Sequence, residues 1–160
     1  MRFDDVFAHV VGEEGGYSND RRDPGGETKF GISKRSYPLV DIANLTLDQA
    51  KAIYQRDYWE RIRGDELPQP IDEFTFDFAV NSGIEHAAES LQGAVGALRD
   101  GTIGPKTVEA AKSHDPLRVL RLMFVDRAML FALNPNDKLY GRGWFARLFD
   151  RTLSAIKEAT

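Results

Sequence analysis

The stretch Ile71-Asp-Glu-Phe-Thr-Phe-Asp-Phe-Ala-Val-Asn-Ser82 decides the fold class of this chain. Phe74, Phe76, Phe78 and Val80 alternate as they would along a strand, yet the segment is also apolar on nearly every side of a helix. A helix that is apolar all round belongs in the centre of a core. We therefore predict a buried central helix over these residues.

Further helices are predicted on both sides of this central segment. Thr46 and Gln49 have the spacing of a capping box, so one helix should start after Thr46 and reach about Arg63. The others are predicted over Asp4 to Glu14, over a short segment ending near Pro38, over Glu85 to Leu98, from Pro105, from Pro116 to about Ala132, and over Gly143 to Ala159, whose inner stripe would be Phe145, Leu148, Phe149, Thr152 and Ile156. Strand signals are nearly absent. We expect an all-α single globular domain, with at most a short hairpin near residues 17–31.

The length of 160 residues fits one domain. A proline-rich stretch around residues 66–70 divides it into an N-terminal lobe, residues 1–66, and a helical lobe, residues 67–160. No apolar run is long enough to span a membrane, so we expect no stable membrane association. The N-terminal segment from Met1 to Asp5 is too acidic, and its first apolar stretch too short, for a secretory signal. We therefore expect a protein made in the cytoplasm, which other machinery delivers if the substrate lies outside.

Composition excludes several kinds of chemistry and partner. The chain has no cysteine, which removes disulfides, thiolate nucleophiles and cysteine-based zinc sites. Its three histidines are far apart and show no metal-ligand spacing, so we expect neither a metal nor a cofactor. The net charge of −4, without any basic block, argues against nucleic acid as a partner. An acidic chain gains no long-range attraction to an anionic partner, so affinity for one would have to come from a shaped groove.

Glu14 is the first candidate for chemistry. On the predicted first helix it follows Phe7 by seven residues and Val10 by four, so it shares the apolar stripe, whereas Glu13 is turned away. A carboxyl group desolvated on an apolar face has a raised pKa, as a general acid near neutral pH requires. The alternative is a structural carboxylate at a helix end, paired with an arginine.

A glycine-rich loop follows Glu14 and carries Asp20, Asp23, Glu27 and Thr28. Gly15-Gly16 is expected to end the helix before it. A glycosidase places its two acids about 6.5–9.5 Å apart if it inverts and about 5–5.5 Å apart if the second acid is a nucleophile. Glu14 and a loop aspartate can meet either spacing. Asp23 also belongs to an Asp-Pro-Gly-Gly turn signal, which accounts for it without any catalytic role.

This region carries a family resemblance. The string Glu14-Gly-Gly-Tyr-Ser-Asn-Asp-Arg-Arg-Asp-Pro-Gly-Gly-Glu-Thr-Lys-Phe-Gly-Ile32 closely resembles the signature of the glycoside hydrolase family 108 lysozymes. The stretches Phe76-Asp-Phe-Ala-Val-Asn-Ser-Gly83, Leu91-Gln92 and Asp100-Gly-Thr-Ile-Gly-Pro-Lys-Thr107 look like the peptidoglycan-binding-type region that follows in that family. Gly143-Trp144 and Arg147, near the end of the chain, also fit the pattern of this family, so the resemblance covers essentially the whole chain.

The resemblance implies a lysozyme-like fold and an N-acetylmuramidase that acts on bacterial peptidoglycan, an activity that many phage endolysins have. We expect the chain to act as a monomer. The family's catalytic glutamate maps onto Glu14. Phage-type lysozymes more broadly place an aspartate and a threonine after this glutamate. The aspartate would correspond to Asp23, with Asp20 as the alternative, and the threonine to Thr28. Here, however, the threonine lies one residue further from the Gly-Ile pair. Three alternatives stay open: a lytic transglycosylase, a non-catalytic wall-binding module, and a peptidoglycan-degrading toxin from a secretion system.

Five further residues are candidates for substrate binding. Tyr58 and Trp59 could stack on sugar rings, although aromatic packing in the core is an equally good reading for Trp59. Asp77 and Asn81 lie four residues apart on the central helix, where they would either satisfy loop backbone or point into a groove. Gln92 is a weaker candidate of the same kind.

Overall fold

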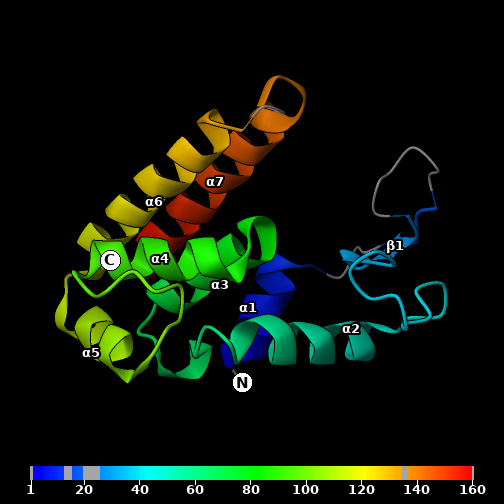
Figure 1. The fold of residues 1–160 in the computed structure, drawn as a ribbon, viewed down its shortest axis with the longest axis horizontal. Coiled ribbons are helices and arrows are strands. Elements are labelled where there is room, and N and C mark those ends of the chain that lie inside the picture. Colours follow the sequence, from blue (N-terminus) through cyan, green and yellow to red (C-terminus); the bar gives the residue numbers. More distant parts are fainter. Residues whose placement is uncertain (1, 13–15, 20–25, 135–136, 160) are drawn as a thin grey trace. The chain divides into compact units, whose positions relative to one another are not determined.

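The computed structural model describes residues 2–12, 16–19, 26–134 and 137–159. The chain divides into two compact units, Met1–Asp57 and Tyr58–Thr160, each of which is described by itself. Helices dominate the described residues, and the β-structure among them is one small hairpin with an isolated bridge beside it (Figure 1). The predicted mostly-α fold is therefore confirmed, whereas the predicted division at residues 66 and 67 stays a prediction.

The first unit opens with helix α1 (Arg2–Val10), which buries an apolar stripe at helical spacing. The stripe consists of Phe3, Val6, Phe7 and Val10. The helix was predicted to reach Glu14, but it ends at Val10. Gly12 (φ +76°) takes the left-handed conformation that terminates helices, and its amide donates to the Phe7 carbonyl at 3.3 Å. Because α1 ends before Glu14, the predicted place of Glu14 on the apolar face of this helix has no support in the structure. Glu14 itself lies outside the described residues.

A hairpin follows at the end of the glycine-rich loop. Strands β1 (Thr28–Lys29) and β2 (Ile32–Ser33) are antiparallel, with Thr28 opposite Ser33. Phe30 and Gly31 both have positive φ, as a two-residue turn of this hand requires. A side chain at Gly31 would also collide with the hydroxyl of Tyr54, which donates to the Phe30 carbonyl at 3.1 Å.

Helix α2 (Leu47–Tyr54) begins at the predicted capping box, because Thr46 and Gln49 satisfy each other's backbone amides. It continues as a π-helical turn, η1 (Gln55–Trp59), and Arg63 then has a left-handed backbone with φ +56°. The helix predicted to end near Pro38 is wrong: the described chain from 34 to 44 forms turns and bends.

The second unit holds a short 3₁₀ turn, η2 (Gly64–Glu66), and five α-helices. These are α3 (Ile71–Ser82), α4 (Ile84–Ala94), α5 (Pro105–Ser113), α6 (Pro116–Ala132) and α7 (Asp137–Ala159). The predicted bounds of α3 are confirmed, as are the predicted starts of α5 and α6. Helix α4 ends four residues before the predicted Leu98, and α7 begins six residues before the predicted Gly143.

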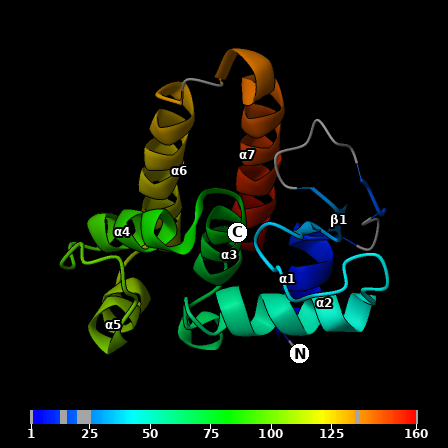
Figure 2. The same cartoon turned by 45° about the vertical axis from the view of Figure 1, so that its right-hand side comes forward.

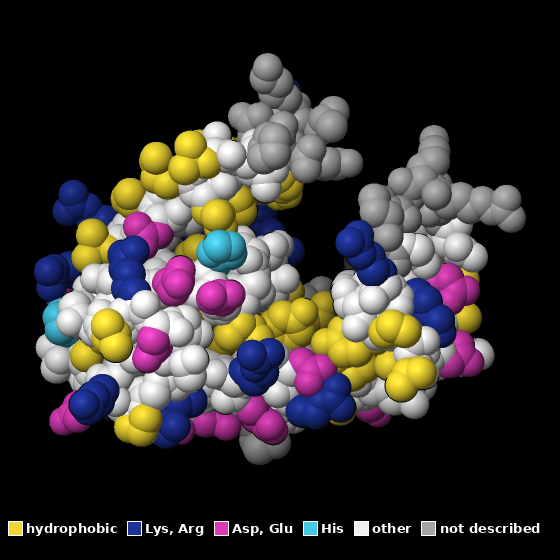
Figure 3. Space-filling model, in the orientation of Figure 1, with side chains coloured by type: hydrophobic (Ala, Val, Ile, Leu, Met, Phe, Trp, Pro, Cys, Tyr) yellow, Lys and Arg dark blue, Asp and Glu magenta, His cyan; other side chains and the backbone are white. Residues whose placement is uncertain are grey.

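Helix α3 is the centre of this unit, since every residue from Ile71 to Ala79 is buried. Helices α6 and α7 form an antiparallel pair, and both pack against α3 (Figure 2). The predicted inner stripe of α7 is partly wrong: Leu148 is buried, but Phe149 and Ile156 are 57% and 40% exposed. Hydrophobic side chains also lie along the outside of α6 (Figure 3). None of the described helices is long and apolar enough to cross a membrane.

Candidate active site

Two of the three residues predicted for catalysis, Glu14 and Asp23, lie outside the described residues, as does Asp20, the rival of Asp23 and a candidate for substrate binding. The third, Thr28, is described, as are Tyr17 to Asn19 before the loop and the hairpin after it. The structure therefore defines the two ends of the loop that carries the predicted catalytic residues.

The two ends of the loop are held together by backbone hydrogen bonds. The Ser18 amide donates to the Thr28 carbonyl at 2.8 Å, and the Thr28 amide donates to the Ser18 carbonyl at 2.8 Å. This isolated antiparallel bridge lies beside β1, so Thr28 is paired on one side with Ser18 and on the other with Ser33. The residues that flank the segment 19–27, Ser18 and Thr28, are thus held side by side.

The backbone of Thr28 is fixed from both sides, and its side chain is half-buried. Its hydroxyl donates to the Gly26 carbonyl at 3.3 Å, a long hydrogen bond. A threonine hydroxyl that donates once still has two lone pairs to accept from a water or a sugar hydroxyl. The family resemblance implies that Thr28 either holds the attacking water or orients the second acid, and both roles stay predictions.

Tyr17 and Glu27 form a second link across the loop ends. The Tyr17 hydroxyl donates to Glu27 Oε1 at 2.9 Å, and this hydrogen bond raises the pKa of Tyr17. Sequence reasoning missed Tyr17, although it directly follows the glycine pair. Both residues are accessible to solvent, so the pair lies at the surface of the predicted site.

The two aromatic candidates at the start of the second unit differ in exposure. Trp59 is 1% exposed: its ring packs edge-on against Phe76, and its indole N–H donates to Asp65 Oδ1 at 3.0 Å. Gly64 lies so close that a Cβ there would overlap the indole. This burial leaves no ring face for a sugar and favours the core interpretation of Trp59. Tyr58 is half-buried and stays a prediction.

Asp77 and Asn81 are joined by a hydrogen bond, in which the side-chain Nδ2 of Asn81 donates to the backbone carbonyl of Asp77 at 2.9 Å. Asp77 has no exposed surface and accepts hydrogen bonds from Arg127 and Arg147, so its position is that of a buried structural carboxylate. Asn81 is exposed on the last turn of α3. Of the two, only Asn81 is placed to meet a ligand.

Gln92 is 1% exposed and organises the loop after α4. Its amide nitrogen donates to Asp100 Oδ1 at 2.7 Å and to the Thr102 carbonyl at 3.0 Å. Its oxygen accepts from the amides of Asp100 at 3.0 Å and Gly101 at 3.1 Å. These four bonds use the amide group fully, which favours a structural role over substrate binding.

Among the described residues, no group of three or more histidines, aspartates or glutamates could hold a metal ion. The described part of the candidate site offers hydroxyls, backbone groups and one surface carboxylate, Glu27. Such groups bind sugars and position water by hydrogen bonds.

Comparison with known proteins places this loop inside a family match. A model of the family described as Glycosyl hydrolase 108 matches residues 7–83, which include the predicted catalytic residues Glu14, Asp23 and Thr28. Among solved structures, one described as SagA of Brucella abortus has 31% sequence identity to this chain and a TM-score of 0.88. The likeness covers 99% of this chain and 95% of that one. No curated protein matches the chain significantly.

Proposed function

Because the chain belongs to the glycosyl hydrolase 108 family, we propose that it is a peptidoglycan hydrolase. The bond cut is the β-1,4 bond between N-acetylmuramic acid and N-acetylglucosamine, the specificity of a lysozyme. The observation that carries the proposal is the family match over residues 7–83, because it contains the whole string from Glu14 to Ile32.

Glu14 is proposed as the general acid that protonates the leaving oxygen. Hydrolysis of a glycoside passes through an oxocarbenium-like state, which needs either an opposing carboxylate or a directed water. Asp23 is proposed for this role, with Asp20 as the competing residue. Thr28 is proposed to hold the attacking water or to orient the second acid.

The described hairpin supports the role of Thr28. Its amide and carbonyl are both hydrogen-bonded to Ser18, and its strand is paired with β2, so its backbone is held from both sides. A catalytic group is effective only when its supporting contacts hold it close to the productive geometry. A bridge that closes the loop at Thr28 supplies such support.

The proposed setting follows from the substrate. Peptidoglycan lies outside the cytoplasmic membrane, so the enzyme acts in the periplasm or the cell wall after release or export by other machinery, of which a phage holin is one form. It acts as a monomer on this polymer. The chain uses no cofactor in this proposal, because the acid and the water carry the reaction.

The test is the lysis of purified peptidoglycan, measured as a fall in turbidity, with four variants. Glu14→Gln keeps the shape of the side chain but removes the acid, so the rate should fall by a factor of about 10²–10⁴, the usual contribution of a general acid. Glu13→Gln is the matched control, one residue away, and should lyse at the wild-type rate. Asp23→Asn should lose more activity than Asp20→Asn.

Two results would overturn this assignment. The first is normal lysis by Glu14→Gln. The second is loss of lysis in Glu13→Gln with Glu14→Gln active, which would move the acid to the neighbouring residue. Circular dichroism of each variant verifies that helix content is unchanged, so that a loss of lysis reports on chemistry.

A further inference from the structure

The pair of helices α6 and α7 carries most of the exposed hydrophobic side chains of the described chain. Of the twelve large hydrophobic side chains that are exposed among the described residues, nine lie within residues 117–156. They are Leu117, Leu122, Val125, Met129, Leu133, Phe145, Phe149, Leu153 and Ile156. Single exposed apolar residues are normal, whereas a cluster of them marks an interaction site.

The exposed apolar residues of α7 form one stripe along the helix. Phe145, Phe149, Leu153 and Ile156 follow one another at intervals of four, four and three residues, which places them on one side of α7. A different side of the helix, which carries Leu148, is buried. Helix α7 is therefore apolar over a wider arc than its packing in the second unit uses.

An apolar groove of about 430 Å³ lies between the two helices. Its walls include Leu117 and Phe124 of α6 and Phe149 and Leu153 of α7. Within the described chain, Arg121 is the one charged residue that lines the groove. The groove continues the stripe of α7 onto α6, so the two helices present one apolar surface.

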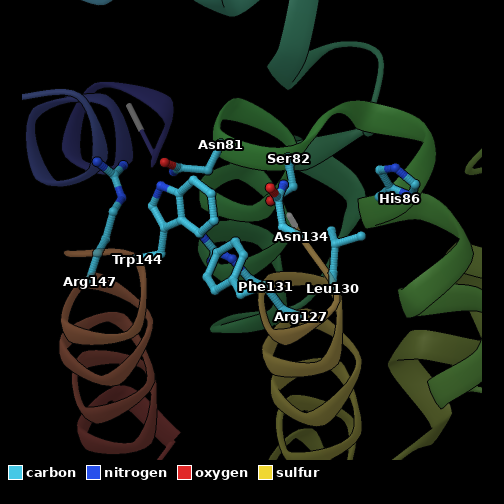
Figure 4. Close-up of a pocket in the computed structure, with 9 residues that line it drawn as sticks. All are labelled: Asn81, Ser82, His86, Arg127, Leu130, Phe131, Asn134, Trp144 and Arg147. Atoms are coloured by element: carbon cyan, nitrogen blue, oxygen red, sulfur yellow. The ribbon is translucent and has the colours of Figure 1, made fainter. Parts of the chain in front are cut away.

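Aromatic contacts hold the two helices together further along the pair. The rings of Phe131 on α6 and Trp144 on α7 meet between the helices, with their centres 5.4 Å apart (Figure 4). The ring of Phe145 packs edge-on against Phe131 at 5.9 Å, although Phe145 is also exposed. The apolar surface is therefore presented by a packed pair of helices.

The α6–α7 pair is basic, although the chain as a whole is acidic. Residues 116–159 contain eight lysines and arginines and four aspartates and glutamates, a net charge of +4, whereas the whole chain has −4. Three of these arginines contact Asp77. Arg118, Arg121, Arg142 and Lys157 are exposed, and none of them has an ion-pair partner within the described chain. Their charge is available to an anionic partner.

We propose that the α6–α7 pair binds the surface of an anionic phospholipid membrane. The exposed apolar side chains enter the boundary between headgroups and acyl chains, and the exposed arginines and Lys157 contact lipid phosphates. A helix with Phe and Leu on one side and Lys and Arg beside them is typical of this interface. Such binding is peripheral and reversible and needs no membrane-spanning helix. The inference does not rest on the proposed function.

Charge argues against a second copy of the chain as the occupant. In a two-fold symmetric dimer the same surface faces itself, so Arg121 and Lys157 would approach the same basic residues of the partner. Among the described side chains of α6 and α7, Asp150 is the one exposed acid. An anionic lipid surface offers negative charge to all of the basic residues at once.

The breadth of the surface argues against a single protein helix as the occupant. A helix seated in the groove would cover Leu117 and Phe149, which line it. It would leave Val125 and Met129 in water, because they are exposed and do not line the groove. Lipid has no fixed shape and adapts to side chains on both parts of the surface.

The test is co-sedimentation of the full chain with two kinds of vesicle. One kind consists of phosphatidylcholine, and the other of phosphatidylcholine and phosphatidylglycerol in roughly equal parts. The protein should bind the anionic vesicles about tenfold or more tightly than the neutral ones. Raising the salt concentration from about 0.05 M to about 0.3 M should weaken this binding several-fold, because the Debye length shortens.

Four variants locate the binding surface. Phe149→Ser and Leu153→Ser each remove an exposed apolar side chain and should weaken binding about tenfold. Arg121→Gln removes one charge and should weaken it about fivefold. The matched control is Leu98→Ser, because Leu98 is 80% exposed but lies outside α6 and α7. This variant should bind as the wild type does.

Lysis of purified peptidoglycan, which contains no lipid, separates this proposal from the proposed function. All four variants should lyse it at the wild-type rate. A wild-type protein that binds anionic vesicles without lysing peptidoglycan would contradict the proposed function and leave the membrane proposal intact. Circular dichroism verifies that each variant keeps its helix content.

Four results would overturn the membrane proposal. No binding to either kind of vesicle at millimolar lipid would favour a protein as the occupant of the groove. Equal binding to anionic and neutral vesicles would exclude the role of the basic residues. Wild-type binding by Phe149→Ser and Leu153→Ser, both folded, would place the contact elsewhere. A dimer that light scattering detects without lipid, and that Phe149→Ser abolishes, would identify a second copy as the occupant.

Discussion

Arg127 Nη1 lies 2.6 Å from Asp77 Oδ2, and neither side chain has any exposed surface. Arg147 Nη2 lies 2.7 Å from the other carboxylate oxygen. Because Asp77 is on α3, Arg127 on α6 and Arg147 on α7, this one carboxylate joins three helices. The ion pairs therefore fix the packing of these helices within the second unit.

Removal of Asp77 should strongly destabilise the second unit. In Asp77→Ala, Arg127 stays buried without its carboxylate, and breaking a buried pair in this way costs about 3–5 kcal/mol. Urea unfolding followed by circular dichroism measures the loss. The matched control is Arg99→Ala, which removes a solvent-exposed pair with Asp126 at 3.4 Å and should cost less than about 1 kcal/mol. Similar losses in the two variants would contradict the structural role of Asp77.

The sequence located Asp77 on a central helix but did not predict its partner. Arg127 lies fifty residues away, and periodicity within one helix says nothing about which other helix packs against it. A signal was present nevertheless: Arg127 follows Met123 by four residues and precedes Phe131 by four, so it shares the buried stripe of α6. Arg147, which the sequence connects only with the family resemblance, contacts the same carboxylate.

Two glycine substitutions should have opposite effects on stability. An alanine at Gly64 would place its Cβ against the buried Trp59 ring, so Gly64→Ala should lower the free energy of unfolding by about 1–3 kcal/mol. Gly143 lies within α7, where a Cβ has no neighbour within 4 Å among the described residues. Gly143→Ala should raise the free energy of unfolding by about 0.5–1 kcal/mol. Thermal denaturation of the two variants tests both signs, and stabilisation by Gly64→Ala would contradict the packing of Trp59.

Stability at low pH should depend on Asp100. Its hydrogen bond from Gln92, and a further one from the Thr102 amide, lower the pKa of Asp100 from the ordinary value of 3.8. A lowered pKa means that the carboxylate stabilises the folded state above pH 3.8, and that this contribution is lost as the pH falls through the lowered pKa. Asp100→Asn should therefore show a flatter decline in the urea midpoint between about pH 5 and pH 2.5. A decline as steep as in the wild type would contradict the Gln92–Asp100 contact.

Thr28 should contribute to hydrolysis through its hydroxyl. Thr28→Val keeps the shape that suits a strand but removes the hydroxyl, so lysis should fall by about tenfold or more while stability changes little. Thr28→Ser keeps the hydroxyl and should retain most of the activity. Initial rates of lysis and urea midpoints separate the two effects. Equal activity of the serine and valine variants would exclude a role for the hydroxyl.

The glycines and acidic residues of the loop predict its place in the chain, but they do not predict where α1 ends before it or how the two ends of the loop are joined. The apolar spacing continues to Glu14 and so predicts a helix up to that residue, yet α1 ends at Val10, before Gly12. A single glycine inside a helical pattern does not by itself predict a helix end. The bridge between Ser18 and Thr28 joins residues ten apart through backbone atoms alone, so no pattern of side chains in the sequence predicts it.

The most direct test of the proposed hydrolysis is mass spectrometry of the fragments that the wild-type protein releases from purified peptidoglycan. Hydrolysis adds one water at each cut, so the proposal predicts fragments with intact reducing ends at N-acetylmuramic acid, absent from a Glu14→Gln digest. Fragments that end in anhydromuramic acid, lighter by one water, would show a lytic transglycosylase instead. Binding to the peptidoglycan without release of fragments would contradict any catalytic function.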